Sequence, residues 1–343
     1  MKIGILTSGG DCPGLNAVIR AIVRKCDQSG FESIGIFNGW KGVFDESYKT
    51  LNLNNIAGII NKGGTILGTS RFSHFQNENG EETLLHKISK ENFDCLITIG
   101  GEGSMHIAQR AHELGINVIG IPKTIDNDIS GTDYTFGFDT AVGIATEAID
   151  RLHTTAESHH RIMILEVMGR HAGWIALYSG IAGGADVVII PEVKSKMSDI
   201  VSILKSRYKR GKLFSIIVIA EGASFSEEEL EIIIVNKKLD EFGRQRLGGI
   251  SNFLAEEVER LTGFETRATI LGHVQRGGMP SAFDRVLGTR LGIYSVEMAK
   301  EKKFGRMAAL QSNEITDIPI KEAIGKLKTV DMKLYEVAQV FFK

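Results

Sequence analysis

The segment Val118–Asp128, VIGIPKTIDND, places a lysine, a threonine and two aspartates directly after an apolar run. Asp126 and Asp128 are separated by one residue, so the two carboxylates could have different roles in a reaction. One carboxylate can accept a proton from an attacking hydroxyl while the other orients water around a metal ion. Lys123 adds a cation where phosphate charge would develop. Asx-rich turns are also common for structural reasons, so the pattern alone leaves both interpretations open.

Two glycine-rich segments follow apolar runs in the same way. Thr7–Asn16 reads TSGGDCPGLN, and Cys95–Ser104 reads CLITIGGEGS. Glycines between a buried strand and a helix let backbone N–H groups approach a phosphate, and the helix N-terminus adds positive potential. Glu102 beside such a loop suits a hydrated Mg²⁺ next to phosphates. A structural turn in the first segment, and a helix N-cap at Ser104 in the second, are the alternatives.

Arginines recur where the apolar runs begin or end. Arg161 precedes one run, Met168–Arg170 follows it, and Arg267 opens another that leads into His273–Gly278. Several arginines at strand ends, in a chain of net charge -2, indicate a focused anion site. Glu221 ends a further run, where a carboxylate can bind sugar hydroxyls.

Several common signatures are absent from the sequence. There is no GxxxxGK[ST], so the chain lacks a P-loop, and no GxGxxG, which weakens a dinucleotide-binding interpretation. The nine histidines show no HExxH spacing and no CxxC occurs, so zinc is not expected.

The elements that must position these residues alternate along the chain. Short β-branched apolar runs, a glycine-bearing turn and a longer segment of helical period follow one another. Near-continuous apolar runs are typical of strands buried on both faces, and this alternation predicts an α/β fold with largely parallel sheets. Such sheets bind ligands at the carboxyl ends of their strands. We expect strands at Lys2–Thr7, Ser33–Phe37, Cys95–Ile99, Val118–Ile121, Ile162–Val167, Val187–Ile190 and Ser215–Ala220, and helices at Ala17–Asp27, Met105–Leu114, Ala141–Ser158, Met197–Lys209 and Ile250–Leu261.

Composition limits the class of protein. The 343 residues include 39 glycines and 5 prolines, with 43% hydrophobic and 24% charged residues, which excludes disorder and collagen. No stretch approaches the length of an apolar membrane span, and the near-zero net charge argues against nucleic-acid or membrane-surface binding. Three widely spaced cysteines and no signal-peptide pattern predict a cytoplasmic protein with reduced thiols.

The length predicts two domains, and the polar stretch Ser224–Arg246 is expected to be a surface insertion.

The ordered motifs resemble the phosphofructokinase family over about residues 1–299. They are TSGGDCPGLNAVIR, NKGGTILGTSRF, IGGEGS, PKTIDNDI, SHHRIMILEVMGRHAGW, AGGAD with the following PE, AEG and ETRATILGHVQRGG. The resemblance implies phosphoryl transfer to the C1 hydroxyl of fructose 6-phosphate, the committed step of glycolysis, with Mg²⁺. It implies two doubly wound α/β domains, a donor domain of residues 1–138 plus about 276–305 and a fructose 6-phosphate domain of about 139–275 plus 306–343. It also implies a homotetramer, with a homodimer as the alternative.

The resemblance also assigns roles to residues. Asp126 is the expected catalytic base, with Thr124, Arg170 and Lys123 beside the transferred group. Glu102 is the expected metal-associated residue, and Asp128 is a second candidate, acting through water. Arg161 and Arg267 are expected to complete the site of a neighbouring subunit. The expected ATP site is Gly10, Arg71, Phe72, Gly101, Glu102, Gly103 and Ser104; the expected substrate site is Thr124, Ile125, Asp126, Arg161, Met168, Gly169, Arg170, Glu221, Arg267, His273, Val274, Gln275 and Arg276.

The phosphoryl donor depends on two positions. Family members that use ATP typically carry glycine where Gly103 stands, and those that use pyrophosphate carry aspartate there and lysine where Lys123 stands. This chain combines Gly103 with Lys123. An aspartate would fill and repel the space for the α-phosphate, whereas Gly103 leaves it open, so we expect ATP, with pyrophosphate or dual use as the alternative. A non-catalytic sugar-phosphate sensor and a nicotinamide oxidoreductase are the other classes, and the intact Asp126 and the missing GxGxxG count against them.

Overall fold

The computed structural model describes residues 1–73, 75, 79–225 and 249–342, and these form two compact units. The first unit contains residues 1–125, 129–140 and 276–327, and the second contains 126–128, 141–275 and 328–343. Most of the stretch expected to be a surface insertion, Ser224–Arg246, lies outside the described residues.

The first unit is built on a sheet of seven described strands in the order β11-β10-β5-β4-β1-β2-β3. Neighbouring strands are parallel from β2 to β10, while β3 and β11 add at the two edges as antiparallel partners of β2 and β10. The strands span β1 Lys2–Ser8, β2 Glu32–Ile36, β3 Tyr48–Leu51, β4 Cys95–Gly100, β5 Val118–Pro122, β10 Arg306–Gln311 and β11 Glu314–Pro319.

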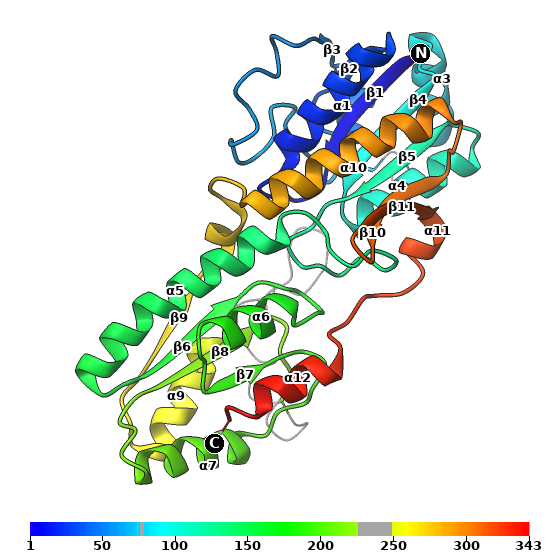
Figure 1. Ribbon diagram of the computed structural model, residues 1–343. Helices are drawn as coiled ribbons and strands as arrows, with labels where there is room; N and C mark the ends of the chain where they lie inside the picture. The colour runs from blue at the N-terminus through cyan, green and yellow to red at the C-terminus, as the bar shows by residue number, and fades with distance from the viewer. Residues whose placement is uncertain (74, 76–78, 226–248, 343) are drawn as a thin grey trace. The chain divides into compact units, whose positions relative to one another are not determined.

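Helices cover this sheet because its strands are apolar on both faces. Helices α1 and α10 lie side by side on one face (Figure 1). On the other face, Leu6, Ile36 and Leu96 of the strands join one apolar cluster with Leu84 of α3 and Met105 of α4. The described helices that lie wholly in this unit span α1 Leu15–Ser29, α2 Trp40–Phe44, α3 Gly80–Glu91, α4 Glu102–Glu113, α10 Ala282–Lys300 and α11 Ile320–Ala323.

The second unit has a sheet of four described strands in the order β7-β8-β6-β9, all of them parallel. Helix α6 packs on β7 and β8, α9 packs on β6 and β9, and α12 packs on α6. The strands span β6 Ile162–Val167, β7 Val187–Ile189, β8 Ser215–Ala220 and β9 Thr266–Ile270. The helices span α5 Phe138–His159, whose first turn belongs to the first unit, α6 Trp174–Ala182, α7 Met197–Lys209, α9 Ile250–Thr262, the 3₁₀ helix η2 Gly272–Arg276 and α12 Met332–Gln339.

The expected α/β architecture with largely parallel sheets is confirmed. All seven expected strands and all five expected helices are present, with ends that differ by a few residues.

The expected domain boundary at residue 305 is wrong: residues 306–327 belong to the first unit. The reason is that β10 pairs with β5 in the first sheet and carries β11 as its hairpin partner. Across the described residues, no helix is long and apolar enough to cross a membrane.

Candidate functional site

In the first unit, the glycine loop after β1 is held by a second loop. Gly9 has φ +84°, a left-handed conformation that favours glycine. The Gly9 N–H donates to the Ser70 carbonyl at 2.9 Å, and the Thr69 hydroxyl donates to the Gly9 carbonyl at 2.7 Å. These bonds hold the segment before Arg71 next to Gly9. Arg71 itself is exposed, and the Phe72 ring lies 5.5 Å from that of Phe44.

Two cations lie against Gly10. The Lys123 ammonium donates to the Gly10 carbonyl, and this side chain is only 3% exposed. A Cβ at position 10 would lie 2.5 Å from Arg276 Nη1, so a side chain there would displace the guanidinium from its present position. Arg276, expected as a sugar-phosphate contact, therefore contacts the glycine loop within the first unit. A lysine and an arginine at a glycine loop form a cradle for a phosphate group.

The loop after β4 lies beside the same glycines. Gly101 is the N-cap of α4, so Ser104 is the third residue of the helix and the N-cap interpretation of Ser104 is wrong. Ser104 is 5% exposed, and its hydroxyl would be 3.4 Å from a Cβ at Gly9. A Cβ at Gly103 would meet nothing within 4 Å, so the space directly beside this residue is open.

Glu102 is suited to act as a single carboxylate ligand of Mg²⁺. It lies in the first turn of α4, its side chain is 49% exposed, and its Oε1 lies 3.8 Å from Nε2 of His106 in the same helix. Among the described residues, no group of three or more histidine, cysteine or acidic side chains could hold a metal by itself. A single accessible carboxylate suits Mg²⁺ that arrives with donor phosphates, because such Mg²⁺ needs only one or two protein carboxylates. The second candidate, Asp128, belongs to the other unit.

In the second unit, Asp126–Asp128 form a buried turn. Asp126 is 5% exposed and Asn127 is 1% exposed. Asn127 has φ +52°, a conformation that asparagine tolerates better than most residues. Thr124 and Ile125 precede this turn in the first unit, where the Thr124 carbonyl accepts a bond of 2.7 Å from the Thr135 hydroxyl.

The turn after β6 packs against the end of β8. Gly169 and Arg170 both have positive φ, and the Arg170 N–H donates to Glu221 Oε1 at 3.2 Å. A Cβ at Gly222 would overlap the Arg170 carbonyl, so this close approach requires glycine. Burial raises the pKa of Glu221 above its ordinary value, and the negative charge of Asp126 raises it further. The structure thus brings together the expected residues Asp126, Gly169, Arg170 and Glu221.

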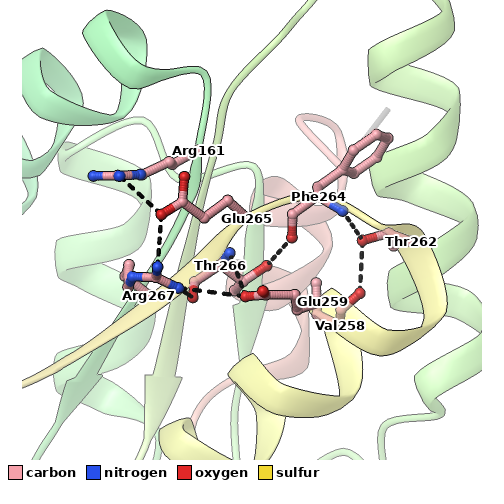
Figure 2. A network of polar contacts seen from close by, with 8 residues as sticks. All are labelled: Arg161, Val258, Glu259, Thr262, Phe264, Glu265, Thr266 and Arg267. Atoms are coloured by element: carbon pink, nitrogen blue, oxygen red, sulfur yellow. Dashed lines mark hydrogen bonds and ion pairs between the residues drawn. The ribbon is translucent and has the colours of Figure 1, made fainter.

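Arg161 and Arg267 lie together in the second unit, as Figure 2 shows. Both contact Glu265 Oε1, at 2.8 Å for Arg161 Nη2 and 2.6 Å for Arg267 Nη2. The hydrogen bond from Arg161 is the main cause that holds the pKa of Glu265 below its ordinary value. Arg267 also contacts Glu259 of α9 at 3.4 Å. Arg161 directly precedes β6 and Arg267 lies in its neighbour β9, and two such adjacent guanidinium groups are a suitable site for a phosphate dianion.

The expected substrate-binding residues of the segment 272–276 differ in their exposure to solvent. His273 and Val274 are exposed, whereas Gln275 is fully buried. The Gln275 side chain accepts a bond of 3.3 Å from the Met168 N–H and donates to the Gly272 carbonyl at 3.2 Å. Gln275 therefore holds the backbone at Met168.

Sequence reasoning missed three polar residues around these groups: Glu192, Glu265 and Lys328. Glu192 accepts the Gly173 N–H at 3.0 Å, and Lys328 donates to Asn127 Oδ1 at 3.1 Å. Glu192 lies in the PE that follows AGGAD, and Glu265 begins ETRATILG. Their places in these family motifs could have identified both as candidate site residues. Lys328 stands in an unremarkable polar segment and carries no such signal.

The family profile described as phosphofructokinase matches residues 2–299. This chain belongs to the phosphofructokinase family. It is similar to a phosphofructokinase of known structure from Saccharomyces cerevisiae, with a TM-score of 0.83 and 30% identity over 99% of this chain. The match covers 46% of that longer yeast chain.

Two curated phosphofructokinase relatives from Streptomyces coelicolor match over the full length of both chains. A pyrophosphate–fructose 6-phosphate 1-phosphotransferase is 51% identical over 344 residues. An ATP-dependent 6-phosphofructokinase 2 is 50% identical over 343 residues. Identity therefore does not discriminate between the two donors.

Proposed function

We propose that this chain transfers a phosphoryl group from ATP to the C1 hydroxyl of fructose 6-phosphate. The observation that carries the proposal is the cradle at Gly10, where the Lys123 ammonium and the Arg276 guanidinium lie against one glycine loop. Phosphoryl transfer requires positioning and charge neutralisation more than covalent chemistry. Lys123, Arg276 and the N-terminus of α4 supply this positive potential to the donor phosphates.

The second unit supplies the acceptor side in this proposal. Asp126 accepts the proton of the C1 hydroxyl as that oxygen attacks the γ-phosphate. Arg170 neutralises charge in the transition state, and Glu221 accepts hydrogen bonds from sugar hydroxyls. Arg161 and Arg267 bind the remote 6-phosphate, whose binding energy orients the attack. By resemblance to the family, these two arginines serve the site of a neighbouring subunit in a homotetramer.

Mg²⁺ would be held by Glu102 and the donor phosphates, and when bound it would neutralise phosphate charge. ATP is favoured by Gly103, because an open space at this position accommodates the α-phosphate. Pyrophosphate is the second candidate. The observation in its favour is Lys123, whose buried ammonium at Gly10 can stabilise a phosphate leaving group.

The deciding experiment measures fructose 1,6-bisphosphate formation with Mg²⁺ and either ATP or pyrophosphate. We expect turnover with ATP to exceed turnover with pyrophosphate by at least tenfold. Turnover with pyrophosphate alone would overturn the donor assignment. Absence of product with both donors would overturn the function. Light scattering after size exclusion tests the tetramer, and a monomer active at assay concentration would contradict it.

A further inference from the structure

Lys328 forms two hydrogen bonds with the turn Asp126–Asp128, and all of these residues belong to the second unit. Its backbone N–H donates to the Asp128 carbonyl at 3.0 Å, and its ammonium donates to Asn127 Oδ1 at 3.1 Å. Asn127 is 1% exposed, so this charged hydrogen bond ends on a buried amide. The turn that carries Asp126 is therefore fixed through its own backbone and through the side chain next to Asp126.

Lys328 is itself held in place by Trp174. The indole N–H of Trp174 donates to the Lys328 carbonyl at 3.0 Å, and the Lys328 ammonium lies 5.1 Å from the Trp174 ring centroid. A cation over a tryptophan face is attracted by the ring quadrupole. Since Trp174 is 8% exposed and begins α6, it ties Lys328 to the framework of the unit.

The next residues of the same segment are fixed by Glu192. Glu192 Oε1 accepts the Val330 N–H at 3.0 Å and the Gly173 N–H at 3.0 Å. The segment 328–330 is thus bound to the turn 126–128, to the start of α6 and to the loop after β7. These contacts give the Lys328 side chain one defined position from which to hold Asn127.

We propose that Lys328 is a positioning residue for phosphoryl transfer, acting through Asn127 to fix the orientation of Asp126. This inference rests on the proposed function, in which Asp126 is the base. A general base must lie within hydrogen-bond reach of the proton that it takes. A small displacement of the turn therefore lowers turnover, while the groups proposed to bind fructose 6-phosphate stay in place.

The test compares Lys328→Met, which keeps the apolar stem, with Lys328→Arg, which keeps a donor and a cation for the ring. Lys326→Met is the matched control, because Lys326 is exposed and its backbone carbonyl, rather than its side chain, accepts a hydrogen bond from the Ser130 hydroxyl. For Lys328→Met we expect kcat to fall roughly tenfold to hundredfold, with the KM for fructose 6-phosphate changed less than about threefold. Lys328→Arg should recover part of this loss, and the control should match the unaltered enzyme.

A double-mutant cycle with Asn127→Gly separates positioning from general stability. Glycine keeps the left-handed backbone and removes the amide oxygen. If Lys328 acts through Asn127, Lys328→Met should cost much less kcat in the Asn127→Gly background than in the unaltered enzyme. An equal loss in both backgrounds, or an unchanged kcat in Lys328→Met, would overturn the inference. Loss of activity with a matching loss of folded protein, measured by thermal unfolding, would also count against it. Failure of the proposed function is recognised separately, because the unaltered chain would then form no fructose 1,6-bisphosphate.

Discussion

Arg161 and Arg267 bind the same carboxylate oxygen, with Glu265 Oε1 at 2.8 Å from the first and 2.6 Å from the second (Figure 2). Glu265 therefore keeps the two guanidinium groups together. It also places a negative charge at the position proposed for the 6-phosphate of the sugar.

Glu265→Gln should lower the KM for fructose 6-phosphate, because the neutral amide no longer competes with phosphate for the arginines. We expect a decrease of roughly threefold to tenfold, in line with the modest strength of exposed ion pairs. Steady-state kinetics at fixed ATP measures it. Glu257→Gln, which removes an exposed ion pair with Arg260 on α9, is the control. A higher KM in Glu265→Gln would show instead that Glu265 organises the arginines.

Gly103→Asp should abolish most ATP-dependent activity without loss of stability. A Cβ at this position would meet nothing within 4 Å, so the substitution is accommodated at that atom, but the new charge would repel the α-phosphate. We expect kcat/KM for ATP to fall by at least about a hundredfold. Gly143→Asp is a matched control, because Gly143 also lies in a helix with nothing within 4 Å of a Cβ. Unchanged ATP kinetics would remove Gly103 as the determinant of the donor.

Asp126→Ser should lower kcat by about a hundredfold to ten-thousandfold, the usual contribution of a general base. The KM values for both substrates should stay within about threefold, because the groups proposed to bind the substrates are intact. Initial-rate measurements with excess enzyme can detect the residual turnover. Near-normal turnover would exclude Asp126 as the base.

Asp284 should make stability depend on pH. Burial raises the pKa of Asp284 to about 6, from an ordinary 3.8, although Thr140 donates to it through both its N–H and its hydroxyl. The folded state then binds this proton more tightly than the unfolded state does. This group's contribution to the free energy of unfolding is therefore greatest below about pH 4 and declines as the pH rises to about 6, by on the order of 2–3 kcal/mol.

Urea unfolding of Asp284→Asn at pH 5 and pH 7 measures this effect, with Asp150→Asn as the exposed control. The Asp284→Asn variant should lose less stability between these pH values than the unaltered chain and the control do. Equal losses in all three proteins would show that Asp284 titrates normally.

Much of the fold follows from the sequence because buried parallel strands are apolar on both faces. Ile162–Val167 and Ser215–Ala220 were predicted to the residue for this reason. Strands β3 and β11 were missed because they are antiparallel partners at sheet edges, with polar residues such as Lys49 and Asp317. Glycines at strand ends likewise led us to expect a phosphate site at Gly10, which stays a prediction.

The partners of the site residues could not be predicted in the same way. Arg276 meets Gly10 where α10 packs beside α1, and Lys328 meets Asn127 across 201 positions of sequence. Such pairs leave no local period and no spacing rule. They are set by topology, which a single sequence specifies only through the complete fold.

The separation of 201 positions between Asn127 and Lys328 also has a consequence in time. At a synthesis rate of about 5–20 residues per second, a ribosome adds Lys328 roughly 10–40 s after Asn127. Throughout that interval the turn with Asp126 lacks the contacts that fix it. A nascent chain therefore holds the turn 126–128 without these contacts until Lys328 has been added. If Asp126 is the base, as proposed, it can be positioned for catalysis only after that point.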